Sequence, residues 1–203
     1  MSKLLLRGFK RFKEKAYEGD DPLMPRLVRE GQDPRYFIIS CIDSRANPGT
    51  IFDTAAGTFF AHKAMGAIVR PYKTGTALAA ALDFAINYNA VDTLIVLGHT
   101  KCGAIDALIQ NLNDEEISSF LEVAQGGLVK AQQKTKPGRD LHRVTEEQIV
   151  LDSVENLTGY PSVRDALAKD KIEIKPWLFD MEQGHICEHN PKTDIFEPIE
   201  SED

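Results

Sequence analysis

Short apolar runs alternate with amphipathic stretches along this 203-residue chain. Residues 36–40 (YFIIS) and 93–97 (TLIVL) are continuous apolar runs of the kind that form buried strands. Weaker strand signals follow at residues 58–61, 171–179 and 185–187, the last of them in a predicted edge hairpin. Strands separated by helices predict an α/β fold. We expect a central, mostly parallel sheet with helices on both faces and one antiparallel edge strand.

Helical periodicity fills the stretches around these strands. Helices are predicted at residues 2–17, 74–89, 115–133, 145–157 and 162–169, and one more is expected to begin at Gly103 or Ala104. Thr74 is the candidate N-cap of the second helix, and Gly126-Gly127 interrupts the third. The acidic tail over residues 197–203 is predicted to be frayed.

The N-terminal stretch is amphipathic. Leu5, Phe9, Phe12 and Ala16 recur at spacings of three and four, opposite a basic face. Such a helix can lie on a membrane surface, or pack on the body of the protein or on a second subunit. We favour packing, because the stripe is short and the rest of the chain is acidic. Residues 1–30 are therefore predicted as a helical arm, and residues 31–203 as a single α/β domain.

Composition excludes several classes of protein. The chain is 42% hydrophobic and carries a net charge of −7, which is typical of a globular protein and unsuited to broad contact with nucleic acid. No stretch reaches the roughly 20 apolar residues of a membrane span, and no secretory signal is found. Three cysteines in a chain of this length do not form a disulfide framework. The sequence therefore predicts a cytoplasmic protein whose cysteines serve a metal or catalysis.

Potential metal ligands follow the two strongest strands directly. Cys41 directly follows the run 36–40, and His99 and Cys102 come just after the run 93–97. If the two strands are parallel neighbours, these side chains converge at one edge of the sheet. Two thiolates and an imidazole suit tetrahedral Zn²⁺, and three ligands leave a fourth position for water. A cysteine at a strand end is also an ordinary core residue, and H-x-x-C arises by chance, so spacing alone leaves both interpretations open.

Other polar residues have competing interpretations. Asp43 and Arg45 could form a bidentate pair that orients a reacting group, or a plain surface ion pair. His62 is a candidate proton relay or a structural histidine, and His142 is expected to face solvent. Cys187 and His189 form C-x-H, a possible second metal site. Its position on an edge hairpin without further ligands argues against that role.

Four segments together resemble the β-class carbonic anhydrases. Cys41-Ile42-Asp43-Ser44-Arg45 resembles their C-x-D-S-R motif, and His99-Thr100-Lys101-Cys102-Gly103 resembles their H-x-x-C-G motif at a matching separation. Ser153-Val154-Glu155-Asn156-Leu157 with Tyr160-Pro161 is similar to a helix of the family, and Trp177-Leu178-Phe179-Asp180 with Gly184 to its late hairpin. The similarity spans about residues 30–190.

The resemblance implies a function. In it, Cys41, His99 and Cys102 bind zinc, and Asp43 with Arg45 orients the zinc-bound hydroxide. The implied reaction is the reversible hydration of CO₂ to bicarbonate and a proton. Family members are dimers or assemblies of dimers, in which the N-terminal helix clasps the neighbouring subunit. CO₂, bicarbonate and a second copy of the chain are therefore the expected partners.

The chain departs from the family around the expected substrate pocket. Lys63-Ala64-Met65-Gly66-Ala67 stands where the family reads close to R-N-A-G-N. Thr54 or Ala55 takes the place of a common glutamine, and Phe84 that of a tyrosine. The pocket is predicted from Thr54, Lys63, Gly103 and Phe84. These changes keep two alternatives open: a zinc hydrolase of COS or CS₂ on the same fold, or a non-catalytic zinc-stabilised domain. A non-catalytic domain would have no use for the pair of Asp43 and Arg45, which we call the dyad.

Overall fold

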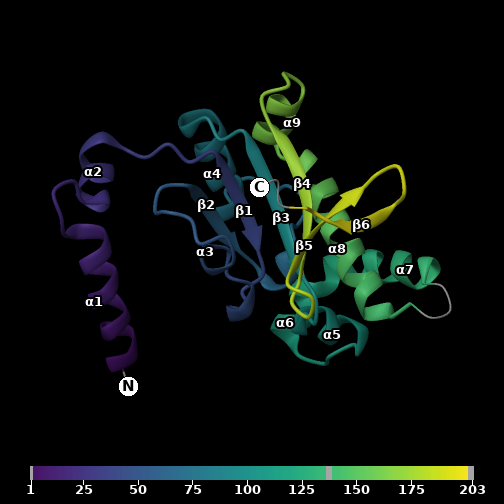
Figure 1. Ribbon diagram of the computed structural model, residues 1–203. Coiled ribbons are helices and arrows are strands. Elements are labelled where there is room, and N and C mark those ends of the chain that lie inside the picture. The colour runs from purple at the N-terminus through teal and green to yellow at the C-terminus, as the bar shows by residue number, and fades with distance from the viewer. Residues whose placement is uncertain (1, 136–138, 201–203) are drawn as a thin grey trace.

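The computed structural model describes residues 2–135 and 139–200, which form an α/β structure around one sheet (Figure 1). The strand order is β2-β1-β3-β4-β5-β6. Their bounds are β1 Tyr36–Ser40, β2 Phe59–Lys63, β3 Thr93–His99, β4 Glu173–Asp180, β5 His185–Asn190 and β6 Ile195–Pro198. The first four strands are parallel, while β5 and β6 are antiparallel. The mostly parallel sheet is confirmed, with two strands at its antiparallel edge where the sequence predicted one.

The second of these edge strands was missed. β6 is only four residues long, and its Glu197 pairs in register with Glu188 of β5. The prediction of a frayed tail from residue 197 is therefore wrong for residues 197 and 198, because they complete a hairpin. Residues 201–203 of that tail lie outside the described residues.

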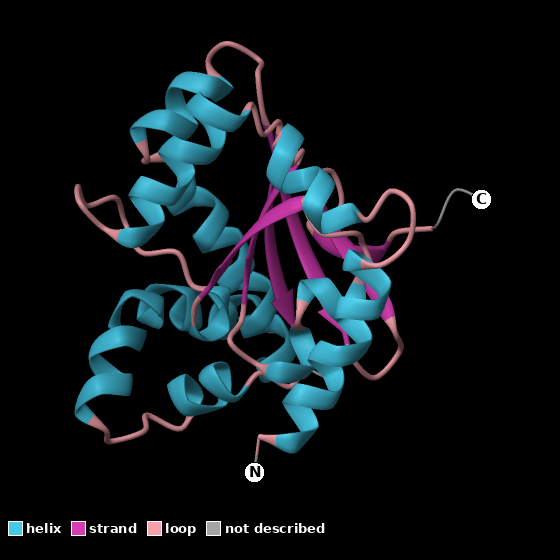
Figure 2. Cartoon of the chain, turned by 90° about the vertical axis from the view of Figure 1, so that its left-hand side faces the viewer, coloured by secondary structure: helices cyan, strands magenta, loops and turns pink. Residues whose placement is uncertain are grey.

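Helices occupy the connections and flank the sheet (Figure 2). Their bounds are α1 Lys3–Tyr17, α2 Leu23–Glu30, α3 Pro48–Ile51, α4 Ala77–Asp83, α5 Gly103–Ile109, α6 Glu115–Leu121, α7 Gln125–Lys134, α8 Leu141–Thr158 and α9 Pro161–Leu167. The short α2 and α3 were not predicted. No helix of the described residues is long and apolar enough to cross a membrane.

Two predicted helices differ from the structure in where they begin or where they are interrupted. α4 is capped by Thr76, whose side chain accepts a hydrogen bond from the Ala79 amide, and not by Thr74. Between them Gly75 has a φ of 76°, outside the helical region. The predicted helix 115–133 is divided by a 3₁₀ turn at Glu122–Ala124, just before Gly126-Gly127.

The two faces of the sheet are covered unequally. One face carries the main core, in which Phe37, Ile39, Leu94 and Val96 of the strands pack against residues of α4, α8 and α9. On the other face Ile38, Ile95 and Leu97 form a smaller cluster, with Ile51 and Phe52 packed against it. α1 and α2 stand beside β2, apart from this body (Figure 1).

The carboxyl ends of β1 and β3 lie side by side, because Ser40 is in register with Leu97. Gly98 lets α8 close tightly over this edge, since a Cβ there would lie 2.5 Å from a methyl group of Val150. The last residues of β3 are thus covered by α8, and the candidate site lies at this end of the strand.

Candidate metal centre

Cys41, His99 and Cys102 form one buried cluster at the carboxyl edge of the sheet. Their ligand atoms all lie within 4.8 Å of one another. The three residues are 4%, 2% and 2% exposed and come from the ends of β1 and β3 and the start of α5. No other cluster of this kind occurs in residues 2–135 and 139–200. The predicted convergence is confirmed, and both cysteines are free of disulfides.

A tight reversal after β3 brings Cys102 back beside His99. Lys101 has a φ of 56°, in the left-handed region that few residues other than glycine adopt. Thr100 anchors the reversal: its amide donates to the Phe179 carbonyl and its hydroxyl accepts from the Met181 amide. Strain of this kind persists where the surroundings impose it, and it is often found at functional sites.

The His99 ring is oriented to offer one lone pair to the cluster. Its Nδ1 lies 2.9 Å from the Thr100 carbonyl oxygen, which can only accept, so Nδ1 carries the proton. Its Nε2 is fully buried and has no hydrogen-bond partner. A buried polar atom without a partner is costly, and a cation between this nitrogen and the two sulfur atoms would satisfy it.

The two cysteine side chains influence each other's pKa. The hydrogen bond from Cys102 lowers the pKa of Cys41, and the same bond raises the pKa of Cys102. The Gly66 amide also donates to Cys41 Sγ at 3.3 Å, from a backbone with a φ of 63° that favours glycine. A cation bound by both sulfur atoms would favour the thiolate form of each cysteine. Soft thiolates with one imidazole fit zinc.

Asp43 and Arg45 form the predicted bidentate pair. Arg45 Nη2 lies 2.8 Å from Asp43 Oδ2, while the Arg45 Nε and amide nitrogen lie 3.1 and 2.8 Å from Oδ1. These hydrogen bonds hold the pKa of the Asp43 carboxyl well below its usual range. Asp43 Oδ2 also lies 4.0 Å from His99 Nε2. The pair therefore adjoins the cluster and presents an ionised carboxylate to it.

Glu146 of α8 is a neighbour of the cluster that sequence reasoning missed. Its Oε1 accepts the Cys102 amide at 3.0 Å and lies 2.9 Å from His142 Nδ1. The prediction that His142 faces solvent is wrong, because its side chain is only 21% exposed and bonds to this carboxylate. The one sequence signal was the i,i+4 spacing of His142 and Glu146. Nothing in chain order connects them to Cys102.

Two predicted pocket residues lie near the cluster edge. Lys63 ends β2 in register with Ser40, the residue before Cys41, and is exposed. No carboxylate of the described chain pairs with Lys63. Gly103 directly follows Cys102, and a Cβ there would meet no atom within 4 Å, so the approach on that side is open. Met65, just after Lys63, packs against the apolar cluster that contains both cysteines.

The other two predicted pocket residues lie elsewhere in the chain. Thr54 lines an apolar cavity of about 300 Å³ with Tyr36 and Phe59, which begin β1 and β2 at the opposite edge of the sheet. Phe84 begins a π-helical segment, Phe84–Tyr88, and contacts Phe60 and Tyr88 while 54% exposed. The structure of the single chain does not bring Thr54 or Phe84 to the cluster, and their role remains a prediction.

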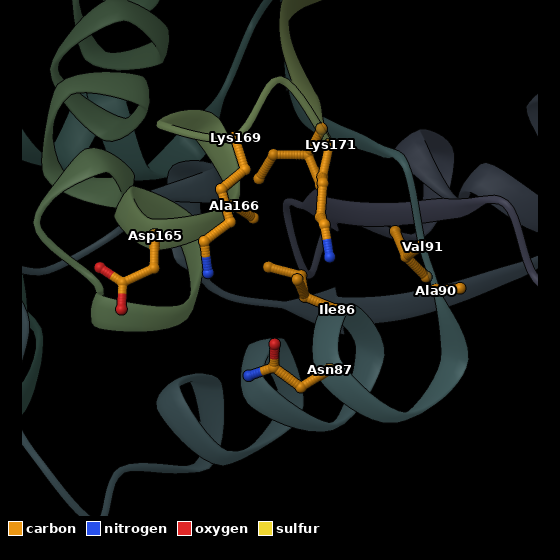
Figure 3. A pocket seen from close by; sticks show the side chains of 9 residues that line it. Ile86, Asn87, Ala90, Val91, Asp165, Ala166, Lys169 and Lys171 are labelled. Atoms are coloured by element: carbon orange, nitrogen blue, oxygen red, sulfur yellow. The ribbon is translucent and has the colours of Figure 1, made fainter.

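A separate pocket of about 300 Å³ lies between the π-helical segment and α9 (Figure 3). Lys169 and Lys171 extend over its apolar lining, which includes Ile86 and Val91. It contains no residue of the cluster or of the Asp43–Arg45 pair. This cavity is thus distinct from the candidate metal centre.

Comparison with known proteins gives this geometry a family. The family model described as carbonic anhydrase matches residues 36–186. The carbonic anhydrase of Synechococcus elongatus is 28% identical over 191 residues, which cover 91% of this chain and 70% of that protein. The carbonic anhydrase of Helicobacter pylori strain J99 is 28% identical over 208 residues, covering 95% of this chain and 92% of that one.

Solved structures share the fold. The β-carbonic anhydrase CcaA superposes with a TM-score of 0.87 at 24% identity, covering 98% of this chain and 92% of that one. A Coccomyxa β-carbonic anhydrase in complex with acetazolamide gives a TM-score of 0.81 at 21% identity, covering 93% and 86%. The chain belongs to the carbonic anhydrase family and has the fold of its β class.

Proposed function

We propose that this protein is a zinc-dependent carbonic anhydrase that catalyses the reversible hydration of CO₂ to bicarbonate and a proton. Family membership supports the reaction, and one observation assigns it to particular atoms of this chain. The unpartnered Nε2 of His99 faces two cysteine sulfur atoms and lies 4.0 Å from an ionised carboxylate. A metal-ligand set and an orienting group therefore meet at one place.

Zinc would be held by Cys41 Sγ, Cys102 Sγ and His99 Nε2. A zinc ion lowers the pKa of a water molecule to about 7, which makes hydroxide available at neutral pH. The protein residues have separate tasks around it. Thr100 fixes the His99 ring through its carbonyl, and Gly66 stabilises the Cys41 thiolate through its amide.

Asp43 is the proposed orienting group. Its Oδ2 would accept a hydrogen bond from the attacking water and thereby direct an oxygen lone pair toward CO₂. Arg45 keeps that oxygen ionised and in place, since it donates to both carboxylate oxygens. Arg45 Nη2 also lies 3.4 Å from the Lys101 carbonyl, which ties the dyad to the reversal that carries Cys102. A purely structural zinc site has no use for this arrangement.

The surroundings suit a small apolar substrate. Met65 and Ile68 pack in the cluster that contains both cysteines, and the space beside Gly103 is open. The same features would admit COS or CS₂, so CO₂ hydration and sulfide release should be assayed side by side. The family match favours CO₂.

We also propose that the chain self-associates through its N-terminal arm, residues 1–30. Three residues of the apolar stripe on α1, Leu5, Phe9 and Phe12, are 76%, 57% and 42% exposed. The helix carries six lysine and arginine residues and one glutamate, whereas the whole chain has a net charge of −7. A second copy is acidic overall, and it offers the thinly covered sheet face with its apolar cavity.

Stopped-flow CO₂ hydration combined with zinc analysis tests the proposal. We expect about one zinc per chain, and catalysis that disappears on chelation and returns with zinc. A protein that binds zinc fully yet does not accelerate CO₂ hydration would instead support the sulfur-substrate or structural alternative.

A further inference from the structure

Glu146 is an unusual residue in this fold. Its side chain is buried, with the residue 4% exposed, and no other carboxylate in the described chain is buried. Burial raises the pKa of its carboxyl, which reflects the cost of placing a charge there. α8 packs against the core, and Glu146 is the one carboxylate among its eight buried residues. Its location inside the protein therefore calls for a specific interaction.

That interaction is with the backbone of a proposed metal ligand. Glu146 Oε1 accepts the Cys102 amide at 3.0 Å, and the same oxygen lies 2.9 Å from His142 Nδ1. The close approach of α8 at Gly98 brings the carboxylate to this position. His142, one turn earlier on α8, contacts that same oxygen.

The Cys102 amide needs such an acceptor. Cys102 follows the strained Lys101 and is the N-cap of α5: its carbonyl accepts the Ile105 and Asp106 amides, whereas its own amide has no acceptor within the helix. Its amide is buried, and a buried amide without an acceptor is costly. Turning this peptide plane would swing the Cα–Cβ bond, and with it Sγ, away from Cys41 and His99.

We propose that Glu146 is a positioning residue that holds Cys102 in its metal-ligating orientation by the reach of one acceptor oxygen. The inference rests on the proposed zinc site, and it assigns Glu146 no contact with zinc or substrate. Because a single oxygen serves both Cys102 and His142, a neutral amide of the same length can replace it. A shorter carboxylate cannot reach, although it keeps the charge.

Two matched substitutions separate reach from charge. Glu146→Gln keeps the acceptor at the same distance and removes the charge, whereas Glu146→Asp keeps the charge and withdraws the oxygen by one methylene. Glu147→Gln and Glu147→Asp are the controls. Glu147 is the next residue on α8, with a side chain only 13% exposed, and it pairs with Arg139 and Arg143 and not with the cluster.

The first readout is the rate at which the zinc-loaded protein releases zinc to an excess of chelator. Glu146→Asp should accelerate release by about 10- to 100-fold, the usual effect of removing an outer-shell partner of a metal ligand. Glu146→Gln and both Glu147 variants should release zinc at close to the wild-type rate. The second readout is the thiolate-to-metal absorption of the cobalt-substituted protein, which should change in Glu146→Asp alone.

Several results would overturn the inference. If Glu146→Asp releases zinc at the wild-type rate, the reach of the acceptor oxygen does not matter. If Glu146→Gln releases zinc as fast as Glu146→Asp, the negative charge is needed as well as the reach. If Glu146→Asp does not fold, hydrogen exchange of the Cys102 amide in unaltered protein decides: slow exchange supports the inference, and exchange as fast as an exposed amide refutes it. Failure of the wild type to bind zinc would instead overturn the proposed function, and this inference with it.

Discussion

Two parts of the molecule carry cysteine and histidine close together, yet only one of them resembles a metal centre. At the carboxyl edge of the sheet, Cys41, His99 and Cys102 come from separate elements and place three ligand atoms within 4.8 Å. On β5, Cys187 and His189 are neighbours in sequence and gather no third ligand into such a cluster within the described chain.

The difference lies in how each side chain is satisfied. His189 Nε2 lies 3.0 Å from the Asp194 carboxylate, and its ring packs on Phe196. Cys187 is buried in the main core, where burial raises its thiol pKa. By contrast, His99 Nε2 is buried without a partner and faces the two sulfur atoms. Proximity in sequence is therefore a poor guide to metal binding, and an unsatisfied lone pair among other donors is a better one.

Exchanging one cysteine in each place gives the largest expected contrast. Cys102→Ser should remove or greatly weaken zinc binding and abolish CO₂ hydration, because it replaces a thiolate ligand with a poor one. Cys187→Ser should retain one zinc per chain. Metal analysis after gel filtration measures both, and full zinc retention in Cys102→Ser would refute the assignment of the ligands.

The aspartates beside the two histidines provide the next test. Asp43→Asn should keep zinc but lower the hydration rate by about 10²- to 10⁴-fold, since orienting and acid–base groups contribute on that scale. Asp194→Asn, which alters the partner of His189, should leave the rate near wild type. Stopped-flow assays at neutral pH compare them. An undiminished rate in Asp43→Asn would show that the Asp43–Arg45 pair is only a surface ion pair without a role in catalysis.

Removing α1 tests whether the metal cluster depends on a second copy. Cys41, His99 and Cys102 all belong to one chain, so a variant lacking residues 2–17 should still bind one zinc per chain. Its self-association should weaken, because the exposed stripe of Leu5 and Phe9 is gone. Light scattering over a concentration series measures this, and a full-length protein that stays monomeric would exclude the proposed role of the arm.

The smallest expected effect concerns the wall near the cluster. Lys63 is a compact point charge where the resemblance expects the planar fork of arginine, and Met65 beside it is apolar. Bicarbonate should therefore inhibit weakly, and Lys63→Arg should strengthen inhibition several-fold, below the limit of about 3 kcal/mol for a strong electrostatic stabiliser. Lys169→Arg, in the distant pocket of Figure 3, is the control. Tight inhibition of the wild type would show that other donors bind the anion.

Much of the site was readable from the sequence because its ligands follow the two most apolar runs. Buried parallel strands leave a strong local signal, and ligands bind at their carboxyl ends, so Cys41, His99 and Cys102 could be named together. The two-residue separation of Asp43 and Arg45 also predicted that they could pair, but their orienting role came from the resemblance. The N-terminal helix was equally clear from its apolar stripe.

Only the tertiary structure decided what lies around those residues. Glu146 meets Cys102 across 44 residues, and Gly66 meets Cys41 across 25, through backbone amides whose partners no side-chain pattern records. Thr54 and Phe84 were placed by resemblance, but in this chain they face other surfaces. Periodicity reports which side of an element is apolar. Which elements meet, and which amide reaches which acceptor, depends on how the whole chain packs.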